Sequence, residues 1–237
     1  MLCLCISSAI ASYAFYGDES FTAANFACHV GLGQTRAVFP AYSVRILQHS
    51  LSQITLALTA GVTIYDIFVS PNRHLPQDQD PIEIARLVNT VFTNTSGIVW
   101  IGAQNTREWI SGDTAGNLVY IKSMIYEFMN QGRSVGVFTT QSVWSTSFAN
   151  ADFTYYESWN PLSTNYMVRA LIPLWETKMM YIGDDYPSIY EYFHNWWGDV
   201  VGGWGYSTSA TSRVPPIMKA IPNEYEECGH IYGKFFY

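Results

Sequence analysis

Short apolar segments and longer segments of helical periodicity alternate along most of the chain. The β-branched and aromatic runs predict strands, and between them apolar residues recur every three or four positions, as on one face of a helix. The predicted strands cover residues 36–42, 62–70, 97–101, 134–139 and 170–175. Repeated strand–helix units place their strands parallel in a sheet that helices cover. The pattern is compatible with an open sheet and with a closed barrel.

Three of the helices between these strands carry end signals and an apolar stripe. The N-terminal signals are the capping box Asp80-Pro81-Ile82-Glu83 and either Asp113 or Thr114, and the C-terminal signals are Gly61 and Gly132. The stripes predicted to face the sheet are Leu47, Leu51, Ile54 and Leu58, then Ile84, Leu87, Val88, Val91 and Phe92, and finally Leu118, Ile121, Ile125 and Phe128.

Composition narrows the class of protein. The chain has 237 residues, 49% of them hydrophobic and only 13% charged, which favours one domain with a large core and argues against disorder. A formal net charge of −7 argues against a nucleic-acid partner, because an acidic surface repels phosphates. No segment has about 18 uninterrupted apolar residues, so no membrane span is expected. The five histidines show no ligand spacing, so neither a metal site nor a cofactor is predicted.

The N-terminus predicts secretion. Residues 1–14 form a short apolar run with small residues, Ser12 and Ala14, at a cleavage site, which is typical of a signal peptide, although a buried first strand or helix is the alternative. The mature domain is then 15–237 and retains Cys28 and Cys228. An even pair in an oxidising compartment suggests one disulfide, against the alternative of two buried thiols. Asn94 begins an Asn-Thr-Ser glycosylation sequon.

Seven short motifs occur along the chain in an order that resembles one family of lysozymes. They are Phe26-Ala27-Cys28, the segment Gly61–Pro71, Val99-Trp100 with Thr106 and Trp109, Ser134 to Ser145, Pro173-Leu174-Trp175, Gly202-Gly203-Trp204, and Cys228-Gly229 to Tyr237. Together they resemble glycoside hydrolase family 25 lysozymes of the nematode and amoeba branch. The resemblance implies an α/β fold, an irregular single-domain (β/α) barrel of the TIM-like glycosidase type, with its binding cleft at the carboxyl ends of the strands.

The departures from this family fall at its catalytic acids. Tyr16, Gly102, Gln104 and Gly233 stand where the resemblance places carboxylates. Glycoside hydrolysis requires a carboxylic acid to protonate the leaving oxygen and a carboxylate to support the cationic transition state. A glutamine keeps the shape of a glutamate without its titratable proton. We therefore expect no catalytic residue at these positions.

Other residues are candidates for replacement acids or for a binding cleft. Asp18 and Glu176 are fallback acids, although solvated loop charges are the alternative, and Asp66 is either a functional acid or a structural carboxylate paired with Arg36. The residues expected to line the cleft are Tyr16, Gln104, Trp109, Trp175, Glu176 and Trp204. The aromatic residues between Tyr186 and Tyr206 either stack on sugars or form a satellite core.

These observations favour a secreted or lysosomal lysozyme-like protein that does not hydrolyse glycans. It would bind a peptidoglycan-like glycan or a protein partner through the former active-site cleft, in a setting such as innate immunity. The alternatives are an active muramidase that uses relocated carboxylates, and a structural or signalling protein with a closed cleft.

Overall fold

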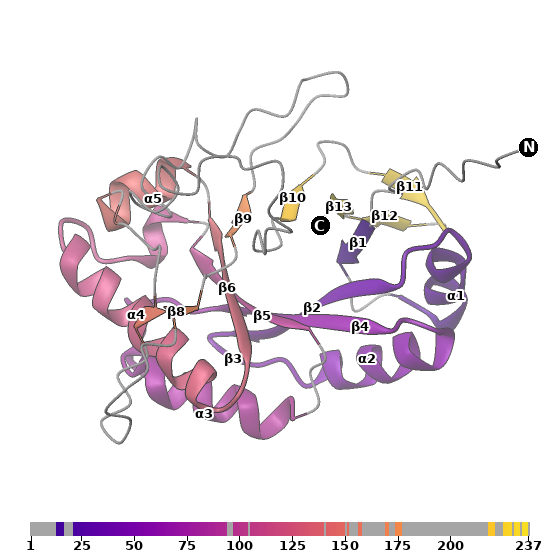
Figure 1. The fold of residues 1–237 in the computed structure, drawn as a ribbon, viewed down its shortest axis with the longest axis horizontal. Coiled ribbons are helices and arrows are strands. Elements are labelled where there is room, and N and C mark those ends of the chain that lie inside the picture. Colours follow the sequence, from indigo (N-terminus) through magenta and orange to yellow (C-terminus); the bar gives the residue numbers. More distant parts are fainter. Residues whose placement is uncertain are drawn as a thin grey trace, which may run out of the picture.

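Four strands lie side by side and parallel at the centre of the structure (Figure 1). They are β2 (Arg36–Ser43), β4 (Ile64–Ser70), β5 (Ile98–Ala103) and β6 (Ser134–Thr139). Each matches a segment that the sequence predicts, since these runs combine β-branched and aromatic residues. The computed structural model describes residues 13–16, 21–93, 97–103, 105–139, 141–149, 151, 156–157, 169–170, 174–176, 218–220, 225–228, 230–232 and 234–236.

Shorter strands extend this sheet from β6 back to β2. β9 (Leu174–Glu176) is parallel to β6 and to β10 (Met218–Ala220). β13 (Lys234–Phe236) is antiparallel to β10 and to β1 (Tyr13–Tyr16), and β1 is parallel to β2. The pairings therefore run in a ring that two strands from opposite ends of the chain complete. β3 (Arg45–Ile46) pairs with β2 at the edge of this sheet. Two separate two-stranded sheets are formed by β7 (Tyr156–Glu157) with β8 (Arg169–Ala170) and by β11 (Tyr225–Glu227) with β12 (His230–Tyr232).

Helices cover one face of the four central strands (Figure 1). They are α1 (Ala23–Gly31), α2 (His49–Ala60), α3 (Pro81–Val91), α4 (Thr114–Asn130) and α5 (Gln141–Phe148), with 3-10 turns η1 (Pro76–Asp78) and η2 (Thr106–Glu108) between them. The predicted end signals are present. Asp80 accepts hydrogen bonds from the N–H groups of Ile82 and Glu83, Asp113 caps α4, and Gly61 ends α2 with a φ of 107°.

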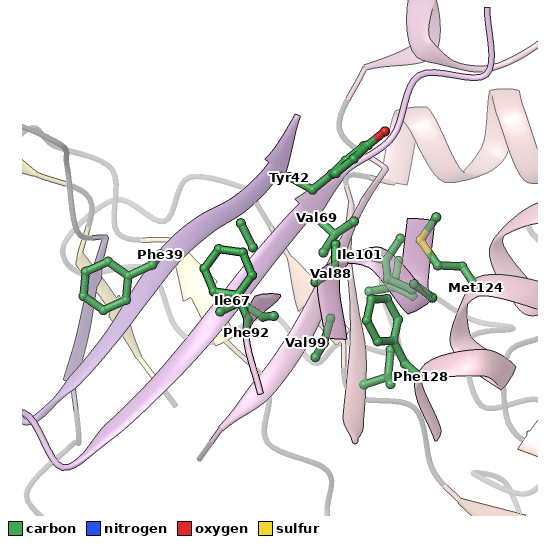
Figure 2. Packing of buried hydrophobic residues seen from close by; sticks show 14 of the residues in the cluster. Phe39, Tyr42, Ile67, Val69, Val88, Phe92, Val99, Ile101, Met124 and Phe128 are labelled. Carbon is green, nitrogen blue, oxygen red and sulfur yellow. The ribbon is translucent and has the colours of Figure 1, made fainter. Parts of the chain in front are cut away.

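The core lies between the helices and the sheet (Figure 2). Ile67, Val69, Val99 and Ile101 project from β4 and β5. They pack against Val88 of α3, Phe92 at its C-cap, and Met124 and Phe128 of α4, all at most 2% exposed. Burial of one such side chain contributes about 1.5–3 kcal/mol. These contacts hold the strand ends in place.

Two predicted helix stripes are partly wrong. Leu58 is 45% exposed and Leu87 is 46% exposed, although both were expected to face the sheet. In α2 the buried face is instead Ser50, Gln53, Ile54 and Ala57. The hydroxyl of Ser50 donates to the carbonyl of Pro40 on β2, so a polar contact helps to set the rotation of this helix. The predicted strand 170–175 corresponds to the end of β8 and the beginning of β9.

A disulfide joins Cys28 on α1 to Cys228 in the turn between β11 and β12, with the Cα atoms 5.7 Å apart. The predicted disulfide is thereby confirmed. The side-chain amide of Asn25 donates to the carbonyl of Cys228 at 2.8 Å, which adds a second contact between the same two elements. Within the described part of the chain, no helix is long and apolar enough to cross a membrane.

Candidate functional site

The candidate site lies where β4, β5, β6 and β9 end. Gly102 is in register with Phe138, and Phe138 with Trp175, while Ala103, Thr139 and Glu176 form the next row. In parallel sheets the carboxyl ends of the strands carry the functional residues. We refer to Phe68, Gly102, Phe138, Trp175 and Glu176 as the strand-end site.

Side-chain alternation separates the residues inside the ring of strands from those that face the helices. Ile67, Val69, Val99 and Ile101 pack against the helices. Because successive strand residues point to opposite faces, Asp66, Phe68, Trp100 and Gly102 lie on the inner face. A hydrogen bond from the indole of Trp100 to Asp66 joins two of these inner residues.

The carboxylate of Asp66 is fully buried and accepts four hydrogen bonds. Arg36 donates through Nε at 3.0 Å and Nη2 at 2.9 Å, the N–H of Ile98 donates at 2.7 Å, and the indole of Trp100 donates at 2.9 Å. Each carboxylate oxygen receives two of these donors. These four donors occupy the acceptor positions of the carboxylate and leave none for a ligand. The predicted pairing of Asp66 with Arg36 is therefore present in the structure.

The place in front of Gly102 is filled by an aromatic side chain. A Cβ atom on Gly102 would lie 2.6 Å from Cζ of Phe68, a separation that real Cβ contacts essentially never show. The Phe68 ring meets the Phe138 ring edge to face, with centroids 5.3 Å apart. These rings are 7% and 8% exposed, so both are largely buried. An acidic side chain at position 102 therefore requires Phe68 to move.

The turn after β5 is tied to the loop after β4. The side chain of Asn105 caps η2 by accepting from the N–H of Arg107 at 3.0 Å. The N–H of Arg73 donates to the carbonyl of Glu108 at 2.9 Å, and Nε2 of His74 lies 3.1 Å from the carbonyl oxygen of Trp109. These contacts hold the two post-strand loops together beside the strand-end site.

Trp109 lies in the core, 1% exposed, rather than on the wall of a cleft as predicted. Its ring packs against Phe148 at 4.7 Å and Tyr120 at 5.9 Å between centroids. The prediction was wrong because the packing of α4 and α5 against the turn decides the direction of this side chain. Aromatic character by itself is equally typical of a core residue and of a sugar-stacking residue.

Glu108 is a residue of this turn that the sequence analysis did not single out. It is partly buried, and its Oε2 atom is enclosed without a hydrogen-bond partner among the described residues. Burial raises the pKa of its carboxyl group above the ordinary value. A signal was present in the sequence, since Glu108 is the acidic residue within the Thr106 to Trp109 motif next to β5.

A polar cluster reinforces the loop after β4. The buried carboxylate of Asp78 accepts from the hydroxyl of Tyr42 and, at 2.7 Å, from the N–H of Asn72. Burial and then this hydrogen bond raise the pKa of the Tyr42 hydroxyl, so it stays protonated as a donor. The hydroxyl of Tyr120 donates to the carbonyl of Asp78 at 2.7 Å. The cluster is fully paired, and we assign it a structural role.

For the other predicted site residues, the structure gives a backbone position, or they lie outside the described residues. Tyr16 is in register with Val38, and Trp175 and Glu176 end β9, so the backbone places all three on the ring of strands. Among the described residues, no group of three His, Cys, Asp or Glu side chains is arranged to hold a metal ion. Predicted positions outside the described residues are Asp18, Asn94, Gln104, Trp204, Gly233 and the whole aromatic segment 186–206.

The fold is shared with muramidases and bacterial lysozymes. One similar solved structure is the muramidase from Acremonium alcalophilum. It has a TM-score of 0.59 and 14% identity, and the match covers 96% of this chain and 93% of that one. The lysozyme from Streptomyces coelicolor has a TM-score of 0.53 and 15% identity over 75% and 79% of the two chains. The modular autolysin LytC from Streptococcus pneumoniae has a TM-score of 0.51 and 11% identity, and the match covers 96% of this chain and 47% of the autolysin chain.

The sequence places the chain in one family within this class. Residues 7–160 match the family described as lysozyme-like protein 1, and the chain belongs to that family. No curated protein sequence matches it.

Proposed function

We propose that this protein binds a peptidoglycan-like glycan at the strand-end site without hydrolysing it. In this proposal the ring of strands is the irregular (β/α) barrel of glycosidases, and the carboxyl ends of its strands form the former cleft. Membership of the lysozyme-like family and the fold of the muramidase neighbours support a glycan as the ligand class.

The observation that carries the proposed lack of hydrolysis is the environment of Gly102. The residue has no side chain, and the Phe68 ring fills the space that an acid would need. The inner carboxylate of β4, Asp66, is held by four donors, so no acceptor position is left for a substrate. General acid–base catalysis contributes about 10²–10⁴ in rate for each group, so the loss of such groups removes turnover.

The aromatic rings at the strand-end site favour sugar binding over a purely structural role. Phe68 and Phe138 are 7% and 8% exposed and contact one another, and the backbone of Trp175 follows in register on the next strand. Flat aromatic surfaces pack against the apolar faces of sugar rings.

We further propose that residues 1–14 are a signal peptide and that the protein is secreted or lysosomal. The Cys28–Cys228 disulfide supports an oxidising compartment, and a role in innate immunity fits such a location.

The proposal is tested by separating binding from turnover on purified peptidoglycan. We expect saturable co-sedimentation and no release of reducing ends. Phe138→Leu should weaken binding about two- to tenfold, because an aromatic contact is worth about 0.5–1.5 kcal/mol. Val119→Ala, at a site on α4 that is 65% exposed, is the matched control and should bind normally.

Two results would contradict the proposal. Release of reducing ends that is lost in Glu176→Gln or Asp18→Asn would establish the alternative of an active muramidase with relocated carboxylates. Failure of the folded protein to bind peptidoglycan would favour the alternative of a structural or signalling protein.

A further inference from the structure

The turn that follows β5 contains two enclosed polar atoms without partners among the described residues. One is the acceptor Oε2 of Glu108, and the other is the donor Nε1 of Trp109. Buried polar atoms in native proteins almost always have a hydrogen-bond partner, which is a protein group, an ordered water or a ligand. Each of these two atoms therefore needs a partner from outside the described protein groups.

Exposure distinguishes the two atoms. The Trp109 side chain is 1% exposed and is enclosed by Phe148 and Tyr120, so nothing larger than a water molecule reaches its indole nitrogen. Glu108 is only partly buried, so its side chain remains accessible although Oε2 itself is enclosed. A partner for Glu108 can therefore belong to a ligand.

The position of Glu108 is suited to a ligand contact because its backbone is firmly held. The carbonyl of Glu108 accepts from the N–H of Arg73, and the turn that carries it is capped by Asn105. The turn begins at Thr106, three residues after the end of β5, the strand that carries Gly102 of the strand-end site. A carboxyl group held in this way loses little conformational entropy when a ligand binds.

We propose that Glu108 is a binding residue of the glycan site and accepts a hydrogen bond from a hydroxyl or N-acetyl N–H group of the saccharide. This inference rests on the proposed glycan-binding function. Hydrogen bonds to an ionised carboxylate are stronger than bonds between neutral groups. The saccharide therefore prefers the ionised form of Glu108.

This preference predicts a pH dependence. Burial raises the pKa of Glu108 above its ordinary value in the free protein. As the pH falls through this raised pKa, Glu108 becomes protonated in the free protein, and the affinity for the saccharide therefore falls. The other charged groups of the surrounding elements are Arg107 on the same turn, Arg73 and His74 on the loop after β4, and Asp113, which pairs with Arg73. Burial is the cause of the raised pKa of Glu108.

Calorimetric titration with chitotetraose between about pH 4 and 7 tests the inference, because this range covers an ordinary and a raised carboxyl pKa. We expect Glu108→Ala to weaken binding on the order of tenfold at neutral pH, as one charge-assisted hydrogen bond is lost. Glu108→Gln keeps the shape of the side chain and should remove the loss of affinity at low pH. Glu83→Gln, at an exposed position on α3, should keep the affinity and pH profile of the unmodified protein.

The outcomes separate the two proposals. Suppose that the unmodified protein binds chitotetraose and that both Glu108 variants match it in affinity and pH profile. This result would overturn only the role of Glu108 and leave the proposed function standing. Unmodified protein that binds neither chitotetraose nor peptidoglycan would overturn the proposed function and this inference with it. Cleavage of chitotetraose that disappears in Glu108→Gln would replace the binding role by a catalytic one.

Discussion

Gly102 and Phe68 act as a steric pair on the inner face of neighbouring strands. The glycine leaves room for the phenyl ring, and the ring in turn excludes any side chain from position 102. The edge-to-face contact with Phe138 holds the ring from the other side. A larger side chain at position 102 therefore depends on a second residue, Phe68, as well.

Gly102→Ala should destabilise the protein by about 1–3 kcal/mol, the usual cost of overpacking. Gly31→Ala is the matched control, because a Cβ atom there meets nothing within 4 Å, and it should be neutral or slightly stabilising on a helix. The cost at position 102 should shrink in a Phe68→Leu background, which urea unfolding of the four variants measures as a double-mutant cycle. Equal stability of Gly102→Ala and the unmodified protein would show that Phe68 does not block the site.

At the scale of elements, the two helices α2 and α3 begin in different ways. The N-cap of α3 is Asp80, whose carboxylate accepts from two backbone N–H groups, and Pro81 takes the first helical position. The N-cap of α2 is Gln48, whose side chain makes no capping hydrogen bond. The start of α3 is thus determined by its own sequence, while α2 depends more on its contacts with α1 and β2.

This difference predicts unequal effects of alanine at the two N-caps. Asp80→Ala should cost about 1 kcal/mol of unfolding free energy, because two N–H groups of the first turn lose their acceptor. Gln48→Ala should change the unfolding free energy by less than about 0.5 kcal/mol, since it removes no capping bond. Thermal unfolding of both variants tests the prediction, which a larger loss for Gln48→Ala would contradict.

On the scale of the whole molecule, the ring of strands depends on the two ends of the chain. β1 and β13 pair with one another and connect β10 to β2. The disulfide between Cys28 and Cys228, 200 residues apart, holds α1 close to the C-terminal strands. A crosslink that closes so long a loop stabilises the fold mainly by restricting the unfolded chain.

Removal of the disulfide should therefore lower stability strongly. The chain-entropy relation for a loop of this length gives about 5 kcal/mol as an upper value. The double variant Cys28→Ser with Cys228→Ser should unfold at a lower urea concentration than the oxidised protein. Because Cys28 is exposed, a reductant should lower the midpoint of the unmodified protein and leave that of the double variant unchanged. An unchanged midpoint on reduction would contradict this role.

Local features of the sequence determined the elements of this fold. The four central strands, the cap at Asp80, the start of α4 at Asp113 and the end of α2 at Gly61 all depend on residues within a few positions of one another. Their physical causes are backbone propensity, side-chain capping and the freedom of glycine at positive φ. The even pair of cysteines in the predicted mature domain further suggested the disulfide.

Tertiary structure decided which residues meet inside the fold. Strand register brought Phe68 in front of Gly102, and helix packing buried Trp109 while it left Leu58 and Leu87 exposed. The enclosed oxygen of Glu108 likewise depends on the way the turn after β5 packs. Hydrophobicity makes a residue suitable for burial, but the neighbour that covers it comes from strand register and helix rotation, which involve residues far apart in the chain.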